Sequence, residues 1–97
     1  MKLRMLSVAK EEFFEAVRYY NNQREGLGFE FAGEVKDALL RISNFPEAWP
    51  KFSERSRRCL LKRFPYAVLY RADNQHMLVV AIMHMSRDPE HWQNRLH

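Results

Sequence analysis

The stretch RRCLLKRFPYAVLYRADNQHMLVVAIMH (Arg57 to His84) decides the fold. It divides into three runs of strand length, because Phe64-Pro65 breaks the first run from the second and Asp73-Asn74 is a turn signal before the third. The third run, HMLVVAIMH, is apolar on both faces. A strand of this kind is buried on both sides, so we expect it at the centre of a sheet that helices cover.

Residues 9–45 predict two helices, because apolar residues recur there with helical spacing. The first apolar stripe consists of Ala9, Phe13, Ala16, Val17 and Tyr20. The second consists of Leu27, Phe31, Val35, Leu39 and Ile42. We expect Ser7 to cap the first helix, Gly26 and Gly28 to separate the two, and Pro46 to end the second.

The order of the predicted elements is β-α-α-β-β-β followed by a short C-terminal element, with Leu3 to Val8 as a possible first strand. This order predicts an α+β fold over residues 1–97, a single domain in which an N-terminal helical hairpin packs on a small antiparallel sheet. The first strand would join the edge of three antiparallel strands. Period-two alternation places Ala67 and Leu69 on one face of the middle strand and Val68 and Tyr70 on the other.

Length and composition favour a small soluble protein of the cytoplasm. Ninety-seven residues suffice for one modest core. No apolar run approaches the roughly 20 residues of a membrane span, and charges interrupt the N-terminal segment where a signal peptide would be apolar. The one cysteine, Cys59, excludes an internal disulfide and fits a reducing compartment; its apolar surroundings predict a buried side chain.

Charge is distributed unevenly along the chain. Residues 9–47 hold five basic and eight acidic side chains, a balance of −3, whereas residues 48–71 hold seven basic side chains and one acidic, a balance of +6. We expect much of this positive charge on the sheet face away from the helices, where a phosphate backbone or an acidic protein would bind. The seven basic residues are Lys51, Arg55, Arg57, Arg58, Lys62, Arg63 and Arg71.

The segment HMSRDPEHWQNR, residues 84–95, gathers side chains that catalysis or metal binding uses. His84 titrates near neutral pH and suits a general acid or base, but a histidine at the end of a buried strand is also a common structural residue. Trp92 suits a structural anchor, and Asp88-Pro89 suits the start of a short helix. No ligand spacing matches a zinc pattern, so we predict no metal and no cofactor.

The blocks RR…L…FPY.V.Y and H..RDP..W occur here together and in this order. In combination they resemble the RelE/ParE superfamily of toxins from bacterial type II toxin–antitoxin systems, and most closely its ParE-like, plasmid-stabilisation branch. The resemblance covers about residues 9–95. It implies the fold already described, a cognate antitoxin as partner, and a toxin that inhibits DNA gyrase without being an enzyme.

The RelE branch implies an alternative, a ribosome-dependent endoribonuclease (mRNA interferase) that acts on mRNA in the ribosome. Its catalytic candidates here are Arg58, Lys62, His84 and Arg87. This chain departs from that pattern at Ala67, where the nucleases have an arginine, and at Trp92, where a tyrosine would serve. A third alternative is an inactivated member that retains only antitoxin binding. The candidate target-binding residues are Arg57, Arg58, Lys62, Arg63, Arg71 and Arg87.

Overall fold

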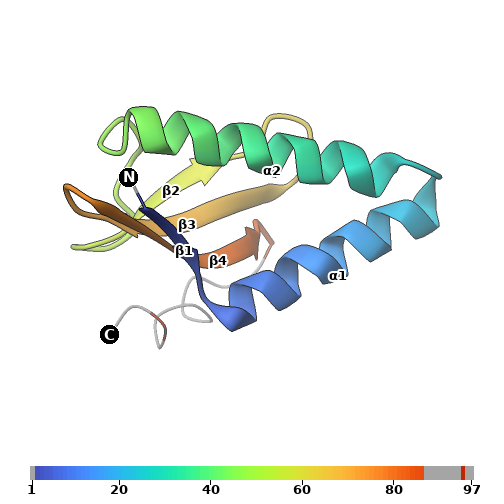
Figure 1. The fold of residues 1–97 in the computed structure, drawn as a ribbon. Helices are drawn as coiled ribbons and strands as arrows, with labels where there is room; N and C mark the ends of the chain where they lie inside the picture. The colour runs from blue at the N-terminus through green and yellow to red at the C-terminus, as the bar shows by residue number, and fades with distance from the viewer. Residues whose placement is uncertain (1, 87–94, 96–97) are drawn as a thin grey trace.

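The computed structural model of the chain describes residues 2–86 and Arg95. The elements follow the predicted order β-α-α-β-β-β, which confirms the α+β fold class. Their bounds are β1 Lys2–Met5, α1 Ser7–Gln23, α2 Leu27–Asn44, β2 Arg57–Leu60, β3 Tyr66–Ala72 and β4 His76–His84. In Figure 1 the two helices meet at one end and diverge towards the other, and β3 and β4 lie in the opening of this V.

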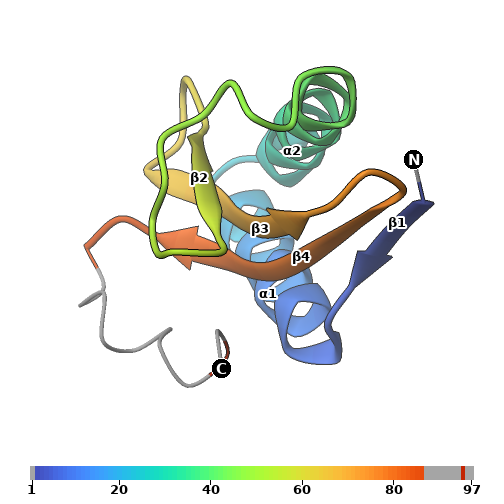
Figure 2. The ribbon, with the colours of Figure 1, turned by 90° about the vertical axis from the view of Figure 1, so that its left-hand side faces the viewer.

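The four strands form one sheet in the order β1-β4-β3-β2, seen from its end in Figure 2. β2, β3 and β4 are antiparallel neighbours, as predicted. β1 is the added edge strand, and it runs parallel to β4, with Arg4 opposite Leu78. The predicted central position of the last strand is therefore confirmed, and the complete sheet is mixed rather than antiparallel throughout.

A β-bulge interrupts the ladder between β3 and β4. Leu69 pairs with Ala81 and Tyr70 pairs with Val79, so that Val80 has no partner on β3. One inserted residue exchanges the faces of all side chains that follow it on the bulged strand. The residues of β4 before and after the bulge therefore alternate in opposite phase. The run itself is apolar because both faces of β4 are buried, with Val79 and Ile82 on one side and Val80 and Ala81 on the other.

The helix-facing side of the sheet holds the main core. Both predicted helical stripes are confirmed: α1 contributes its stripe to this core, and α2 contributes its own together with Ala38. From the sheet it contains Val68, Tyr70, Met77, Val79 and Ile82. A smaller outer cluster on the opposite face consists of Ala67, Leu69, Val80, Ala81 and Met83, with Phe52 packed against it. The two clusters confirm the predicted alternation along β3.

The helix boundaries agree with the sequence in most respects. Gly26 has a positive φ of 85° and is the N-cap of α2, so it separates the helices as predicted, whereas Gly28 lies within α2. The last residue of α2 is Asn44, two positions before Pro46. The prediction that Ser7 caps α1 is wrong, because Leu6 occupies the N-cap position and makes no side-chain cap hydrogen bond. Ser7 instead is the first residue of the helix.

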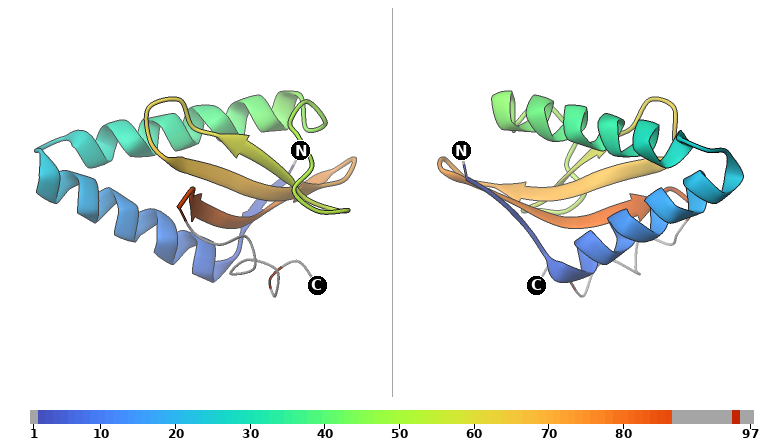
Figure 3. Two further views of the ribbon diagram at one scale, coloured as in Figure 1. Left: turned by 180° about the vertical axis from the view of Figure 1, so that it is seen from behind. Right: turned by 45° about the vertical axis from the view of Figure 1, so that its right-hand side comes forward.

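The hairpin closes through a tight contact at Gly28. A Cβ atom placed there would lie 2.2 Å from the backbone oxygen of Val17. The Gly28 amide also donates to the side-chain oxygen of Asn21 at 2.8 Å. The meeting of the helices that Figure 3 shows from two further sides therefore depends on the absence of a side chain at this position. No helix within the described part of the chain is long and apolar enough to cross a membrane.

Candidate functional site

The strands carry cations and no acidic side chain. Their sequences, KLRM, RRCL, YAVLYRA and HMLVVAIMH, contain five lysine and arginine residues and neither aspartate nor glutamate. The two helices together contain six carboxylates. The charge asymmetry of the sequence is thus also an asymmetry between layers. The five strand cations are Lys2, Arg4, Arg57, Arg58 and Arg71.

The neighbouring residues Arg57 and Arg58 face opposite sides of the sheet. Arg57 pairs with Tyr70, which belongs to the helix-facing core, and its guanidinium donates to the backbone oxygen of Trp49 at 2.7 Å. Arg58 pairs with Leu69 of the outer cluster, and its guanidinium carbon lies 5.9 Å from the centre of the Phe52 ring. Of the two, Arg58 is therefore the one that points to the outer face.

Lys62 and Arg63 follow β2 and are tied to α2 through Glu34. The Glu34 carboxylate accepts hydrogen bonds from the Lys62 amide, from the Arg63 amide at 2.8 Å and from Arg63 Nε at 3.2 Å. Burial raises the pKa of Glu34, but these hydrogen bonds outweigh burial, and the net result is a lowered pKa. Arg63 also binds Glu30 at 3.0 Å, whereas the side chain of Lys62 is exposed.

Arg71 lies on β3 opposite Leu78, whose side chain packs against the outer cluster. It forms no salt bridge with a carboxylate of the described residues. Behind it, Tyr70 is fully buried and its hydroxyl donates to the Pro46 oxygen at 2.6 Å. Burial raises the pKa of Tyr70 to about 12. Tyr70 is thus a structural residue that holds the connection after α2 against the sheet.

His84 lies at the end of β4 on the helix-facing side. It pairs with Tyr66, and the two rings meet edge to face at 4.9 Å. Its Nδ1 accepts a hydrogen bond from the Ser86 amide at 3.1 Å, so the proton of the neutral ring is on Nε2. The ring lines a cavity of about 400 Å³ together with Tyr19, Tyr20, Gln23, Leu27, Pro65 and Tyr66.

Among the candidate catalytic residues that the structure describes, Arg58 and His84 lie on opposite faces of the sheet. Arg58 faces outwards, and His84 faces the helices, because the bulge at Val80 reverses the alternation before β4 ends. Ala67 lies fully buried in the outer cluster. Arg87 and Trp92, and the predicted helix start at Asp88, lie outside the described residues. Among the described residues, no group of three or more potential ligands surrounds a possible metal position.

Sequence reasoning missed two features. Lys2 and Arg4 alternate with apolar residues in KLRM, a period-two pattern that already places both cations on one face of β1. The second is an ion pair between Glu12 of α1 and Arg95, at 2.8 Å and 3.0 Å, with both side chains less than one-fifth exposed. No local pattern signals a contact between residues this far apart along the chain.

Glu12 and Arg95 occupy the open edge of β4. β1 pairs only with the first half of β4, so later backbone groups lack a strand on that side. The Ile82 amide donates to Glu12 at 3.2 Å, and Arg95 donates to the Val80 oxygen at 3.3 Å. The adjacent groove, about 540 Å³ in volume, is lined by acidic residues of α1, by Tyr19 and by His84.

Comparisons with known proteins identify the family of the chain. A family model described as the ParE toxin of the type II toxin–antitoxin system parDE matches residues 3–89. A solved structure titled "Chromosomal ParDE TA system from P. aeruginosa" superposes with a TM-score of 0.76 at 13% identity, covering 89% of this chain and 97% of that chain. A comparison with curated proteins gave no match. Since the family model spans most of the sequence, the chain belongs to the ParE toxin family of type II toxin–antitoxin systems.

Proposed function

We propose that this ParE-type toxin arrests growth by binding DNA gyrase and that a cognate antitoxin neutralises it. The observation that carries the proposal is the separation of Arg58 from His84 on opposite faces of the sheet. RNA cleavage needs a base, a cation for the phosphorane and an acid within reach of one phosphate. An arrangement that divides these groups between two faces favours a binding protein over a nuclease.

The cations that remain unpaired are the best candidates for the target contact. Arg57 is bound to a backbone oxygen and Arg63 to two carboxylates, so each would lose an existing partner on binding. Arg58 and Lys62 have no carboxylate partner among the described residues, and both lie at the β2 end of the sheet. We therefore assign the gyrase contact to the surface around Arg58 and Lys62, with Arg87 as a further candidate in the sequence.

The antitoxin is proposed to cover the groove between α1 and the open edge of β4. At this edge the Ile82 amide and the Val80 oxygen are bound by side chains rather than by a strand, so an added segment would replace Glu12 and Arg95 there. The exposed ring of Tyr19 offers apolar area beside them. Glu11 and Glu15 line the groove beside the Glu12–Arg95 ion pair, so charge complementarity favours a basic part of the antitoxin here. An acidic part of the antitoxin would complement Arg58 and Lys62 at the β2 end of the sheet.

The test is controlled expression of the chain with and without the small neighbouring gene expected to encode the antitoxin. We expect arrest that the second gene relieves, and inhibition of gyrase supercoiling by the purified toxin. Lys62→Gln should weaken inhibition at least ten-fold, while Lys36→Gln, which removes an exposed charge from α2, should leave it unchanged. Cleavage of ribosome-bound mRNA with gyrase unaffected would refute the gyrase assignment and favour the interferase. Growth indifferent to induction would instead favour an inactive family member.

A further inference from the structure

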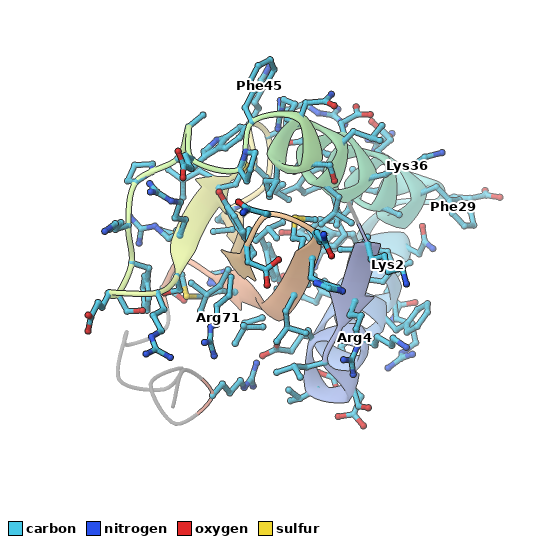
Figure 4. All side chains as sticks on the ribbon, turned by 60° about the vertical axis from the view of Figure 1, so that its left-hand side comes forward. Lys2, Arg4, Phe29, Lys36, Phe45 and Arg71 are labelled. Atoms are coloured by element: carbon cyan, nitrogen blue, oxygen red, sulfur yellow. The ribbon has the colours of Figure 1, made fainter. Side chains whose placement is uncertain are left out.

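The outer face of the sheet carries a row of cations that the proposed gyrase contact does not use. Arg4 of β1 and Arg71 of β3 both pair with Leu78 of β4, one from each side. Three residues in one row across a sheet point to the same face, so the two guanidinium groups flank Leu78 on the outer side. Lys2 stands two residues before Arg4 and shares its face. Figure 4 shows Lys2, Arg4 and Arg71 on the side of the sheet turned towards the viewer.

No carboxylate of the described residues neutralises these cations. The salt bridges of the described residues involve Arg24, Arg63, His76 and Arg95, and none reaches Lys2, Arg4 or Arg71. Lys2 and Arg4 are exposed, and Arg71 is half-buried. A row of like charges that lacks internal counterions concentrates mobile anions from solvent, and release of such ions favours the binding of a polyanion.

The row borders a large groove. A groove of about 1170 Å³ runs between the β3–β4 hairpin and the connection from α2 to β2, and Arg71, His76 and Leu78 line its sheet side. Lys51 and Arg55 line the opposite side. Three acidic residues also line it, but one of them, Asp73, accepts the amides of Gln75 and His76 within its own turn. The remaining two are Glu47 and Glu54 of the connection.

We propose that this row and groove bind the phosphate backbone of duplex DNA. Two strand spacings separate Arg4 from Arg71, roughly 10 Å. Duplex DNA carries one charge per about 1.7 Å of helix axis when both strands are counted, so a length of this size contains about six phosphates, about three on each strand. Lys2, Arg4 and Arg71 offer no aromatic ring on which unpaired bases would stack, and the exposed ring of Phe45 lies on the connection side of the groove, away from these cations (Figure 4). The row therefore favours a duplex over a single strand.

The contact does not depend on the target assigned above, because it is a property of the toxin alone. The test measures binding of the full chain to a fluorescent 20-base-pair duplex by anisotropy, over a series of salt concentrations. With four phosphate contacts, from Lys2, Arg4, Arg71 and Arg55, log K should fall against log[salt] with a slope of about −3.6. The double variant Arg4→Gln/Arg71→Gln should lower the slope to about −1.8 and weaken binding about 100-fold at 50 mM salt.

The matched control is Lys10→Gln/Lys36→Gln, which removes two exposed charges from the helices and gives the same net charge. It should bind as the unmodified chain does. Equal weakening by both double variants would overturn the proposal, because net charge alone would then explain binding. Tighter binding of a single strand of equal charge would overturn the assignment to a duplex. Displacement of the duplex by an Asp/Glu-rich peptide at lower concentration would assign the row to an acidic protein.

Discussion

Replacing Glu34 tests how the segment after β2 is held in place. This carboxylate receives two backbone amides on one oxygen and Arg63 Nε on the other, and its side chain is 11% exposed. Glu34→Gln keeps an acceptor for the amides but puts an NH2 group opposite the guanidinium, which also donates. The variant therefore loses one charge-assisted hydrogen bond, about 2 kcal/mol of the free energy of unfolding.

The assay is urea unfolding at pH 7, followed by circular dichroism and supported by thermal melts. A loss of about 2 kcal/mol corresponds to a fall in Tm of roughly 8–16 °C for a domain of this size. Asp37→Asn is the matched control, because it removes the same charge from the same helix at an exposed position without a described partner. The control should lie within about 0.5 kcal/mol of the unmodified chain.

The pH dependence gives a second readout of the same contact. The pKa of Glu34 is lowered in the folded protein, so its contribution is present above the unfolded value of about 4.3 and is lost as pH falls through the folded pKa. The stability difference between the unmodified chain and Glu34→Gln should therefore shrink on acidification from pH 5 to pH 3. Equal stability of Glu34→Gln and Asp37→Asn, or a difference that does not change with pH, would refute the reasoning.

Two further predictions concern the buried connections of the fold. Tyr70→Phe removes the hydrogen bond to Pro46, so unfolding at pH 7 should become about 1–2 kcal/mol easier. Since the pKa of Tyr70 is raised to about 12, its contribution is complete below about pH 10 and is lost as pH rises through 12, and the variant should lack this alkaline loss in pH-dependent unfolding. Gly28→Ala places a methyl group against the Val17 oxygen and should lower Tm by 8 °C or more. Gly33→Ala, with open space at the same helix, should raise or preserve Tm in the same thermal melts.

The sequence predicted the elements because each has its own local periodicity. The stripe from Leu27 to Ile42 repeats with helical spacing, and the alternation from Tyr66 to Tyr70 repeats with a period of two, so both follow from a few neighbouring residues. No local pattern predicts that β1 runs parallel to β4, because this direction depends on where the helical hairpin and the strands after it lead the chain. The missing cap at Ser7 has a similar reason: a serine before a helical stripe favours a cap, but the helix here begins one residue earlier.

The arrangement of the candidate site was less predictable, because Val80, which has no partner on β3, decides which face His84 lies on. Regular period-two alternation from Leu78 would place His84 on the outer face with Arg58. Such a shared face would suit the catalytic group of an interferase. Val80 breaks this alternation, and a valine in an apolar run gives no sign of a bulge. The same difficulty holds for Glu34, whose binding to the segment after β2 joins residues 28 and 29 positions apart.

The distribution of carboxylates decides which cations of this toxin remain available to a partner. Glu30 and Glu34 of α2 reach Arg63, and Glu12 of α1 reaches Arg95, so the helices neutralise the cations near them. The strands contain no carboxylate, and no salt bridge among the described residues reaches Lys2, Arg4 or Arg71. These cations therefore keep their charge for an external anion. A substitution that brings a carboxylate to this face, such as Leu78→Glu between the two guanidinium groups, would neutralise the row from within. It should abolish duplex binding more completely than either single arginine substitution, because it adds repulsion of phosphate to the loss of free cations.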